Sequence, residues 1–152
     1  MSTVAKDRRP RTAPNSPLTP HDYEVLAEFR YVLMKFLAFS EHAAHQAGLA
    51  PRQHQALLAI KGYPGGTEVT IGDLAARLGI RHHSAVGLVN RLASAGYLAR
   101  REDPSDRRRI LLALTAAGEQ ALAGLSVAHR QELRRVAPVL KSLLIRLGPS
   151  EP

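Results

Sequence analysis

Hydrophobic residues recur along this 152-residue chain with the spacing of amphipathic helices, and they predict a mainly helical fold. Residues 21–47 read as one long helix, in which the stretch from Tyr31 to Phe39 is apolar on nearly every side. A helix of that kind must be buried on more than one side. A small domain rarely wraps a helix so completely, so we expect a partner subunit to cover it. Pro51 is placed to begin a second helix that ends at Gly62, with an inward face of Leu57, Leu58 and Ile60.

Two short amphipathic helices follow, separated by a glycine. Thr70 and Asp73 have roughly the spacing of a capping box at the start of the first helix, which ends at Gly79. The second helix begins near Arg81 and ends at Gly96. Their inward positions repeat at i, i+3, i+4 and i+7, as Ile71, Leu74, Ala75 and Leu78, then Ala85, Leu88, Val89 and Leu92. This is a helix-turn-helix pattern.

The spacing of hydrophobic residues then changes to the alternation typical of strands. It predicts two strands, at residues 97–101 and 110–114, which a charged turn at 102–109 joins into a hairpin. Thr115 is placed to cap a long helix that reaches about Val136. Pro138 should break this helix, and a last helix should run to Leu147. The predicted fold class is mainly α with a small β-hairpin wing, that is, a winged helix-turn-helix flanked by N- and C-terminal dimerisation helices.

These elements divide the chain into five parts. We expect a disordered basic arm at 1–19, an N-terminal dimerisation helix at 20–50, a winged helix-turn-helix at 51–115, C-terminal dimerisation helices at 116–147 and a tail at 148–152. The arm is assigned by its prolines and polar residues, which prevent regular structure.

The distribution of charge along the chain indicates a candidate binding partner. The net charge is +8, and half of it falls in residues 81–109, where seven arginines face three acidic residues. A local basic focus on a folded domain indicates a polyanion, most often nucleic acid. A solvated arginine-rich surface is the alternative.

Composition also excludes several classes. The chain has no cysteine, which excludes disulfides, thiolate nucleophiles and thiol-based redox sensing. No apolar run approaches 18 residues and the N-terminus has no secretory pattern, so we expect no membrane association and a cytoplasmic protein. We expect no cofactor.

A helix followed by a basic hairpin suits double-stranded DNA, because the helix can enter the major groove and an arginine at the hairpin tip the minor groove. The candidate residues on the helix are Arg81, His82, His83, Ser84, Val86, Gly87, Asn90 and Arg91. Those on the wing are Asp106, Arg107, Arg108 and Arg109. Asn90 can read adenine or bind phosphate. Gly87 costs about 1 kcal/mol relative to alanine, which either a close approach by DNA or helix–helix packing would explain.

Residues 70–118 resemble the multiple antibiotic resistance regulator (MarR) family of winged-helix transcription factors. The matching segments are Ile71-Gly72-Asp73-Leu74-Ala75, Val89-Asn90-Arg91-Leu92, Asp103 to Arg108, and Leu112 to Gly118. The resemblance implies a homodimer that binds a near-palindromic operator, and we expect the regulator to be a repressor. It also implies that Asp106 orients Arg108 for the minor groove. Many relatives have Ser or Thr in place of Arg81 and a polar or basic residue in place of Gly87, so the resemblance implies the docking mode but not the sequence preference of this chain.

The resemblance further implies a small aromatic or phenolic effector. Tyr31, Phe39, His42 and His54 are the candidate pocket residues, and plain core or dimer packing is the alternative. His42 and His45 have a spacing that can chelate a metal, but isolated pairs of this kind are usually surface residues, and we expect no metal site.

Two other functions compete with an operator-binding regulator. One is an enzyme, since Ser84, His82, His83 and Asp106 contain the atoms of a hydrolytic set. However, His82 and Ser84 are two apart on one helix and do not face each other. We therefore expect no enzymatic activity. The other is an architectural or RNA-binding winged helix without operator choice.

Overall fold

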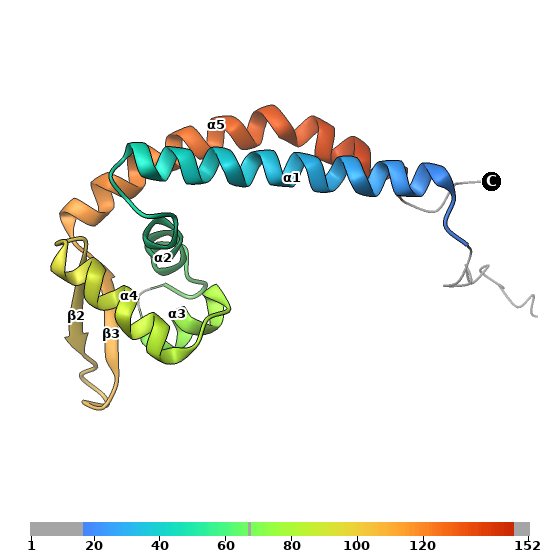
Figure 1. Cartoon of the computed structure of the whole chain (residues 1–152). Helices are drawn as coiled ribbons and strands as arrows, with labels where there is room; N and C mark the ends of the chain where they lie inside the picture. The colour runs from blue at the N-terminus through green and yellow to red at the C-terminus, as the bar shows by residue number, and fades with distance from the viewer. Residues whose placement is uncertain (1–16, 67, 148–152) are drawn as a thin grey trace, which may run out of the picture.

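The computed structural model of the chain describes residues 17–66 and 68–147. Two long helices, α1 (Pro20–Gln46) and α5 (Ala116–Arg146), lie side by side and antiparallel, and a smaller unit hangs from one end of the pair (Figure 1). The smaller unit contains α2 (Pro51–Lys61), β1 (Val69–Thr70), α3 (Ile71–Leu78), α4 (His82–Ser94), β2 (Leu98–Glu102) and β3 (Ile110–Leu114). The predicted mainly helical, winged helix-turn-helix fold is confirmed. The predictions for residues 1–16 and 148–152 lie outside the described residues.

Local interactions determine where α3, the first helix of the helix-turn-helix, begins and ends. The hydroxyl of Thr70 accepts a hydrogen bond from the backbone N–H of Asp73 at 3.2 Å, and the Asp73 carboxylate accepts one from the backbone N–H of Thr70 at 2.9 Å. This capping box satisfies two N–H groups at the start of α3. Gly79 ends α3 with a φ of 62°, in the left-handed region that costs residues with a Cβ about 1–2 kcal/mol.

The core lies where α2, α3, α4 and the sheet meet. Most inward positions predicted for α3 and α4 are buried, namely Leu74, Ala75, Ala85, Leu88, Val89 and Leu92. The prediction for Leu58 is wrong, because its side chain is 49% exposed while Leu57 is fully buried. The buried face of α2 consists of His54, Ala56, Leu57 and Ile60, and Leu58 lies outside it.

The sheet has three antiparallel strands in the order β1-β3-β2. The hairpin of β2 and β3 was predicted, and its register pairs Leu98 with Leu114 and Glu102 with Ile110. Strand β1 was not predicted, since two residues are too few to show a period. It pairs with β3 through Val69 and Leu112, and so joins the start of α3 to the base of the wing.

The predicted break at Pro138 is wrong, because α5 continues through it as one helix. Proline removes one backbone hydrogen bond and crowds the preceding turn, which costs about 3 kcal/mol in a helix interior. Val136 and Leu143, on either side of the proline, are buried, and α5 packs along α1. The packing on both sides offsets the local loss, so the two predicted C-terminal helices are one.

The two long helices leave much apolar surface uncovered in the single chain. Its exposed members on α1 include Tyr23, Leu26, Tyr31, Leu33, Met34 and Leu37, and those on α5 include Leu133, Val139, Leu144 and Ile145. In the described ranges, no helix is both long and apolar enough to span a membrane.

Candidate nucleic-acid interface

The first turn and the outer side of α4 carry the residues predicted to contact DNA. Arg81 is the N-cap residue of α4, without a side-chain capping bond, and His82, His83 and Ser84 are exposed in the first turn. Val86 and Gly87 are half-buried, and Asn90 and Arg91 are exposed. His83, Val86, Gly87 and Asn90 lie on the side of α4 opposite its buried core face, whereas the other four candidates are exposed at its N-terminal end or at the edge of that side. Their contacts with DNA remain a prediction.

Gly87 is not required by packing inside the chain. Among the described residues, a Cβ added at Gly87 would meet only the Nη1 atom of Arg91, at 3.5 Å, which is an ordinary contact with a movable side chain. Helix–helix packing within this chain thus does not explain the glycine. Close approach by an external partner is the remaining explanation of the two that the sequence left open.

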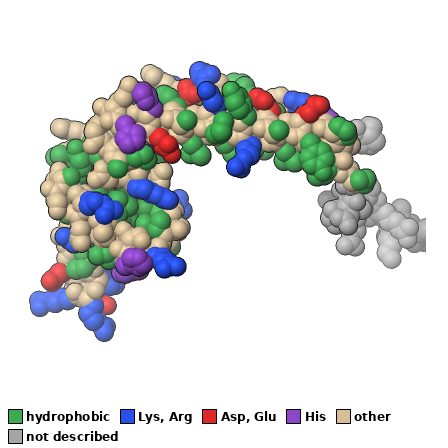
Figure 2. Space-filling view, in the orientation of Figure 1, with side chains coloured by type: hydrophobic (Ala, Val, Ile, Leu, Met, Phe, Trp, Pro, Cys, Tyr) green, Lys and Arg blue, Asp and Glu red, His purple; other side chains and the backbone are tan. Residues whose placement is uncertain are grey.

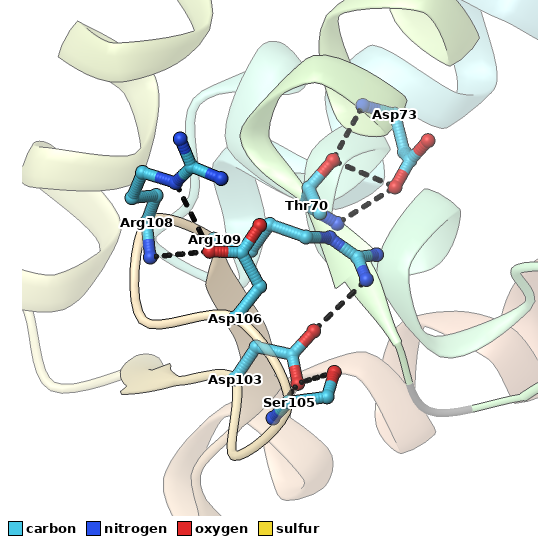
Figure 3. A network of polar contacts seen from close by, with 7 residues as sticks. All are labelled: Thr70, Asp73, Asp103, Ser105, Asp106, Arg108 and Arg109. Carbon is cyan, nitrogen blue, oxygen red and sulfur yellow. Dashed lines mark hydrogen bonds and ion pairs between the residues drawn. The ribbon is translucent and has the colours of Figure 1, made fainter.

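A buried carboxylate organises the wing (Figure 3). The side chain of Asp103 is only 4% exposed and accepts hydrogen bonds from the backbone N–H of Ser105 at 2.8 Å and from Arg109 Nη1 at 2.9 Å. The hydrogen bonds from Ser105 hold the pKa of the Asp103 carboxyl below its ordinary value, and the charge of Arg109 adds to the effect. Asp103 is therefore ionised at neutral pH and ties the two ends of the tip together.

Arg108 and Arg109 differ in their contacts and exposure on this tip. The guanidinium of Arg109 is bonded to Asp103, whereas the side chain of Arg108 is 93% exposed. Asp106 accepts hydrogen bonds from the backbone N–H of Arg108 at 3.0 Å and from its Nε at 3.3 Å. This contact matches the orienting role that the family resemblance implies for Asp106. Arg107 is also exposed.

The tip lies next to the start of α3. Hydrogen bonds from Thr70 lower the pKa of the Asp73 carboxyl, and the charge of Arg109 contributes to the same shift. Thr70, Arg108 and Arg109 also line one shallow cavity together with His82 of α4. The wing tip and the start of α4 are therefore neighbours, as a joint DNA surface requires.

The base of the wing is anchored to α5 by the Thr115-to-Gly118 segment. The Thr115 hydroxyl accepts a hydrogen bond from the N–H of Gly118 at 3.1 Å and donates one to the carbonyl of Gly96. A Cβ added at Gly118 would collide with the backbone carbonyl of Tyr97. The glycine and threonine of this motif are thus needed to pack the hairpin against the helix.

One contact across α4 and the wing involves a residue that the sequence analysis missed. Nη1 of Arg100, on β2, donates a hydrogen bond to Oδ1 of Asn90 at 2.7 Å, and both side chains are exposed. Arg100 could have been noticed only from the alternation of β2, which places it on the opposite face from Arg101. Figure 2 shows Lys and Arg side chains gathered at the wing end of the molecule.

The four residues predicted for an effector pocket do not line one cavity. Tyr31 borders a cavity of about 300 Å³ between α1 and α5, and His54 borders a separate one of about 410 Å³ between α2 and α5. The Phe39 ring packs edge-on against His129 at 5.6 Å, and His42 is exposed. Only His54 of the four therefore lies at the larger cavity, whose other lining residues are Leu58, Ser126, His129, Arg130, Leu133, Arg134 and Ala137.

The remaining candidate groups are the histidines considered for metal binding and the set considered for hydrolysis. Within residues 17–66 and 68–147, no three side chains of His, Asp or Glu come together in a way that could hold a metal ion. His82 and Ser84 lie in one exposed helical turn, and Asp106 is engaged with Arg108.

Comparison with known sequences supports this architecture. Residues 47–109 match the model of the MarR family. YcgE of Bacillus subtilis (strain 168), described as an uncharacterized HTH-type transcriptional regulator, is 31% identical over 97 residues, which make up 64% of this chain and 61% of YcgE. The chain therefore spans about three-fifths of the length of this curated relative.

Solved structures share the fold at low sequence identity. A mutant of MepR from Staphylococcus aureus, whose structure is bound to an oligodeoxyribonucleotide, is 18% identical with a TM-score of 0.62, covering 76% of this chain and 82% of MepR. AbsC of Streptomyces coelicolor, a MarR family transcriptional regulator, is 20% identical with a TM-score of 0.65, covering 80% and 81%. Rv1404 of Mycobacterium tuberculosis is 22% identical with a TM-score of 0.64, covering 89% and 86%.

Proposed function

The chain belongs to the MarR family of winged helix-turn-helix regulators, and from this premise we propose that it binds a near-palindromic operator as a homodimer and represses transcription. The proposal is carried by one observation: the free face of α4 lies beside a wing whose Arg108 is 93% exposed and held by Asp106. In this arrangement the first turns of α4 enter the major groove and Arg108 enters the adjacent minor groove. The MepR mutant, which shares the fold and whose structure is bound to an oligodeoxyribonucleotide, supports DNA as the ligand.

Selection from a pool of random duplexes tests the proposal. The protein should enrich a palindrome whose half-sites lie about 10 bp apart, or a multiple of that spacing. Excess random duplex should not displace the enriched site at physiological salt. Displacement by random duplex, or by RNA, would instead support the architectural or RNA-binding alternative.

The homodimer rests on the exposed apolar faces of α1 and α5. Leu37 and Leu144 are each 57% exposed in the single chain, on helices that carry several further exposed apolar residues. Burying apolar surface contributes about 25 cal/mol per Å², so a second copy is the natural cover for such a stripe. Light scattering should give twice the chain mass of 16.6 kDa. Leu37→Asp should lower this mass, whereas the same change at Ala76, exposed on α3, should not.

A small aromatic acid is the proposed effector, at the cavity of about 410 Å³ between α2 and α5. Its lining is mostly carbon, and Arg130 and Arg134 supply positive charge for a carboxylate. Because α2 belongs to the DNA-binding unit and α5 to the long-helix pair, an occupant there can change the angle between them. Salicylate titrated against a protein–operator complex is the test: release of DNA that is lost in Arg134→Ala supports the proposal.

Repression and a cytoplasmic location complete the proposal. A reporter transcribed from a promoter that contains the enriched palindrome should be silenced when the protein is present. Activation of the same reporter would overturn the repressor assignment but not DNA binding.

A further inference from the structure

We propose that Asn90 and Arg100 form a clamp for a single DNA phosphate, and that Asn90 does not read a base. The inference rests on the proposed DNA-binding function and specifies which part of the interface sets sequence preference. Its starting point is the hydrogen bond of 2.7 Å from Arg100 Nη1 to Asn90 Oδ1, which joins α4 to the wing strand β2.

The chemistry of the pair favours an acceptor-only ligand. A guanidinium can only donate, so the amide oxygen of Asn90 faces Arg100 and its NH₂ group faces away. Asparagine reads adenine by donating to N7 while accepting from the N6 amino group. With its oxygen already bonded to a charged donor, Asn90 presents only N–H groups, beside the free N–H groups of Arg100. Such a site suits the oxygens of a phosphate and carries one positive charge.

The position of the pair also indicates the DNA backbone. His83, Gly87 and Asn90 lie on one stripe of α4, and the rise of 1.5 Å per residue puts Asn90 about 10 Å along the axis from His83. The major groove is about 12 Å wide, so a helix that enters by its N-terminal end reaches the groove wall near Asn90. The wing enters the next minor groove, and the strand between the two grooves is the phosphodiester backbone. A side-chain bridge from α4 to β2 must therefore cross that backbone.

Arg101 provides a matched control on the same strand. Successive strand residues point to opposite faces, so Arg101 points away from α4. It lines a cavity with Lys61 and Glu119 on the other side of the sheet. Arg100→Ala and Arg101→Ala remove the same charge from neighbouring positions, but only Arg100→Ala removes the clamp.

Salt-dependent titration of the variants tests the clamp. Asn90→Ala and Arg100→Ala should weaken binding to the enriched operator and to a random duplex by the same factor, about five- to tenfold. In Arg100→Ala, the slope of log K against log salt should fall by about 0.9, the value for one phosphate. The double variant should bind about as well as Arg100→Ala alone, since the two residues act as a unit. Thermal unfolding should be unchanged, because both side chains are exposed.

Three outcomes would overturn the inference. A repeated selection with Asn90→Ala that relaxes one base position would make Asn90 a base reader, of adenine or, with Arg100, of guanine. Equal loss of affinity in Arg100→Ala and Arg101→Ala would reduce the effect to general charge. Unchanged affinity in both single variants would remove the clamp altogether. If the unmodified protein enriches no duplex, both the proposed function and the clamp are wrong. If it enriches a duplex but the variants bind as well as the unmodified protein, only the clamp is wrong.

Discussion

The imidazole ring of His54, on α2, lies 4.7 Å from that of His129, on α5, measured between ring centroids. His129 is fixed at this position, because Nδ1 lies 2.7 Å from the carbonyl oxygen of Leu125 and Nε2 lies 2.7 Å from the hydroxyl of Ser40 on α1. The pair therefore sits where the DNA-binding unit meets both long helices. Burial lowers the pKa of His54, and the charge of His129 lowers it further.

The lowered pKa of His54 predicts that acidification destabilises the fold. An unfolded histidine, with a pKa of about 6.5, binds a proton that the folded His54 resists. The contribution of neutral His54 is therefore complete above the unfolded pKa and declines as the pH falls from there toward the folded pKa. Urea unfolding at pH 7.5 and pH 5.5 should show this loss, and His54→Gln should show less of it. His42→Gln, at an exposed position of α1, should behave like the unmodified protein. An equal loss in all three proteins would contradict the assignment to His54.

Two glycines of α5 should respond in opposite directions to alanine. A methyl group at Gly118 would collide with the backbone carbonyl of Tyr97, so Gly118→Ala must shift the hairpin and should lower the free energy of unfolding by about 1–3 kcal/mol. A methyl group at Gly124 would meet nothing within 4 Å, so Gly124→Ala should raise it by up to about 1 kcal/mol. Chemical denaturation of the two variants gives the sign directly. Two stabilised variants would mean that the hairpin is not held against α5 as described.

Structural features that depend on neighbouring residues could be predicted from the sequence, whereas those that depend on packing between distant segments could not. The start of α3 and the stop at Gly79 were predictable, because Thr70, Asp73 and the glycine act within one turn of chain. The continuation of α5 through Pro138 was not, because it depends on how α5 packs along α1. The presence of a proline in the sequence indicates its local free-energy cost in a helix, but it does not indicate the packing that offsets this cost.

The candidate interface follows the same division. The helical period of α4 shows which side faces outward, so His83, Val86, Gly87 and Asn90 could be listed from the sequence. The other candidates followed from their position at the start or the edge of the helix. The ion pair of Arg109 with Asp103 and the bond of Arg100 to Asn90 could not be foreseen. The first depends on how the wing tip folds back on itself. The second depends on how the hairpin lies against α4.

Substitution at Gly87 should separate folding from DNA binding. The only described atom near a new Cβ is Arg91 Nη1, at 3.5 Å, so Gly87→Ala should stabilise the protein by up to about 1 kcal/mol. If DNA approaches this point of α4 closely, the same change should weaken operator binding. Thermal unfolding and a mobility-shift titration of one preparation measure both effects. A variant that gains stability and keeps full affinity would show that nothing approaches Gly87.

The two neighbouring arginines of the wing tip should have different roles. Arg108→Ala should weaken operator binding strongly with little change in stability, because its side chain is 93% exposed and its loss leaves no buried charge behind. Arg109→Ala should instead loosen the tip, because it deprives Asp103, 4% exposed, of its cationic partner.

Amide hydrogen exchange distinguishes these two effects. The N–H of Asp103 bonds to the carbonyl of Arg109, and the N–H of Ser105 bonds to the Asp103 carboxylate. In Arg109→Ala both amides should exchange faster, since the carboxylate that organises the tip is no longer neutralised. In Arg108→Ala they should keep their protection while the affinity for DNA falls. Unchanged DNA affinity in Arg108→Ala would remove the wing from the proposed interface. Loss of amide protection in Arg108→Ala would mean that Arg108 stabilises the tip and that its effect on binding is indirect.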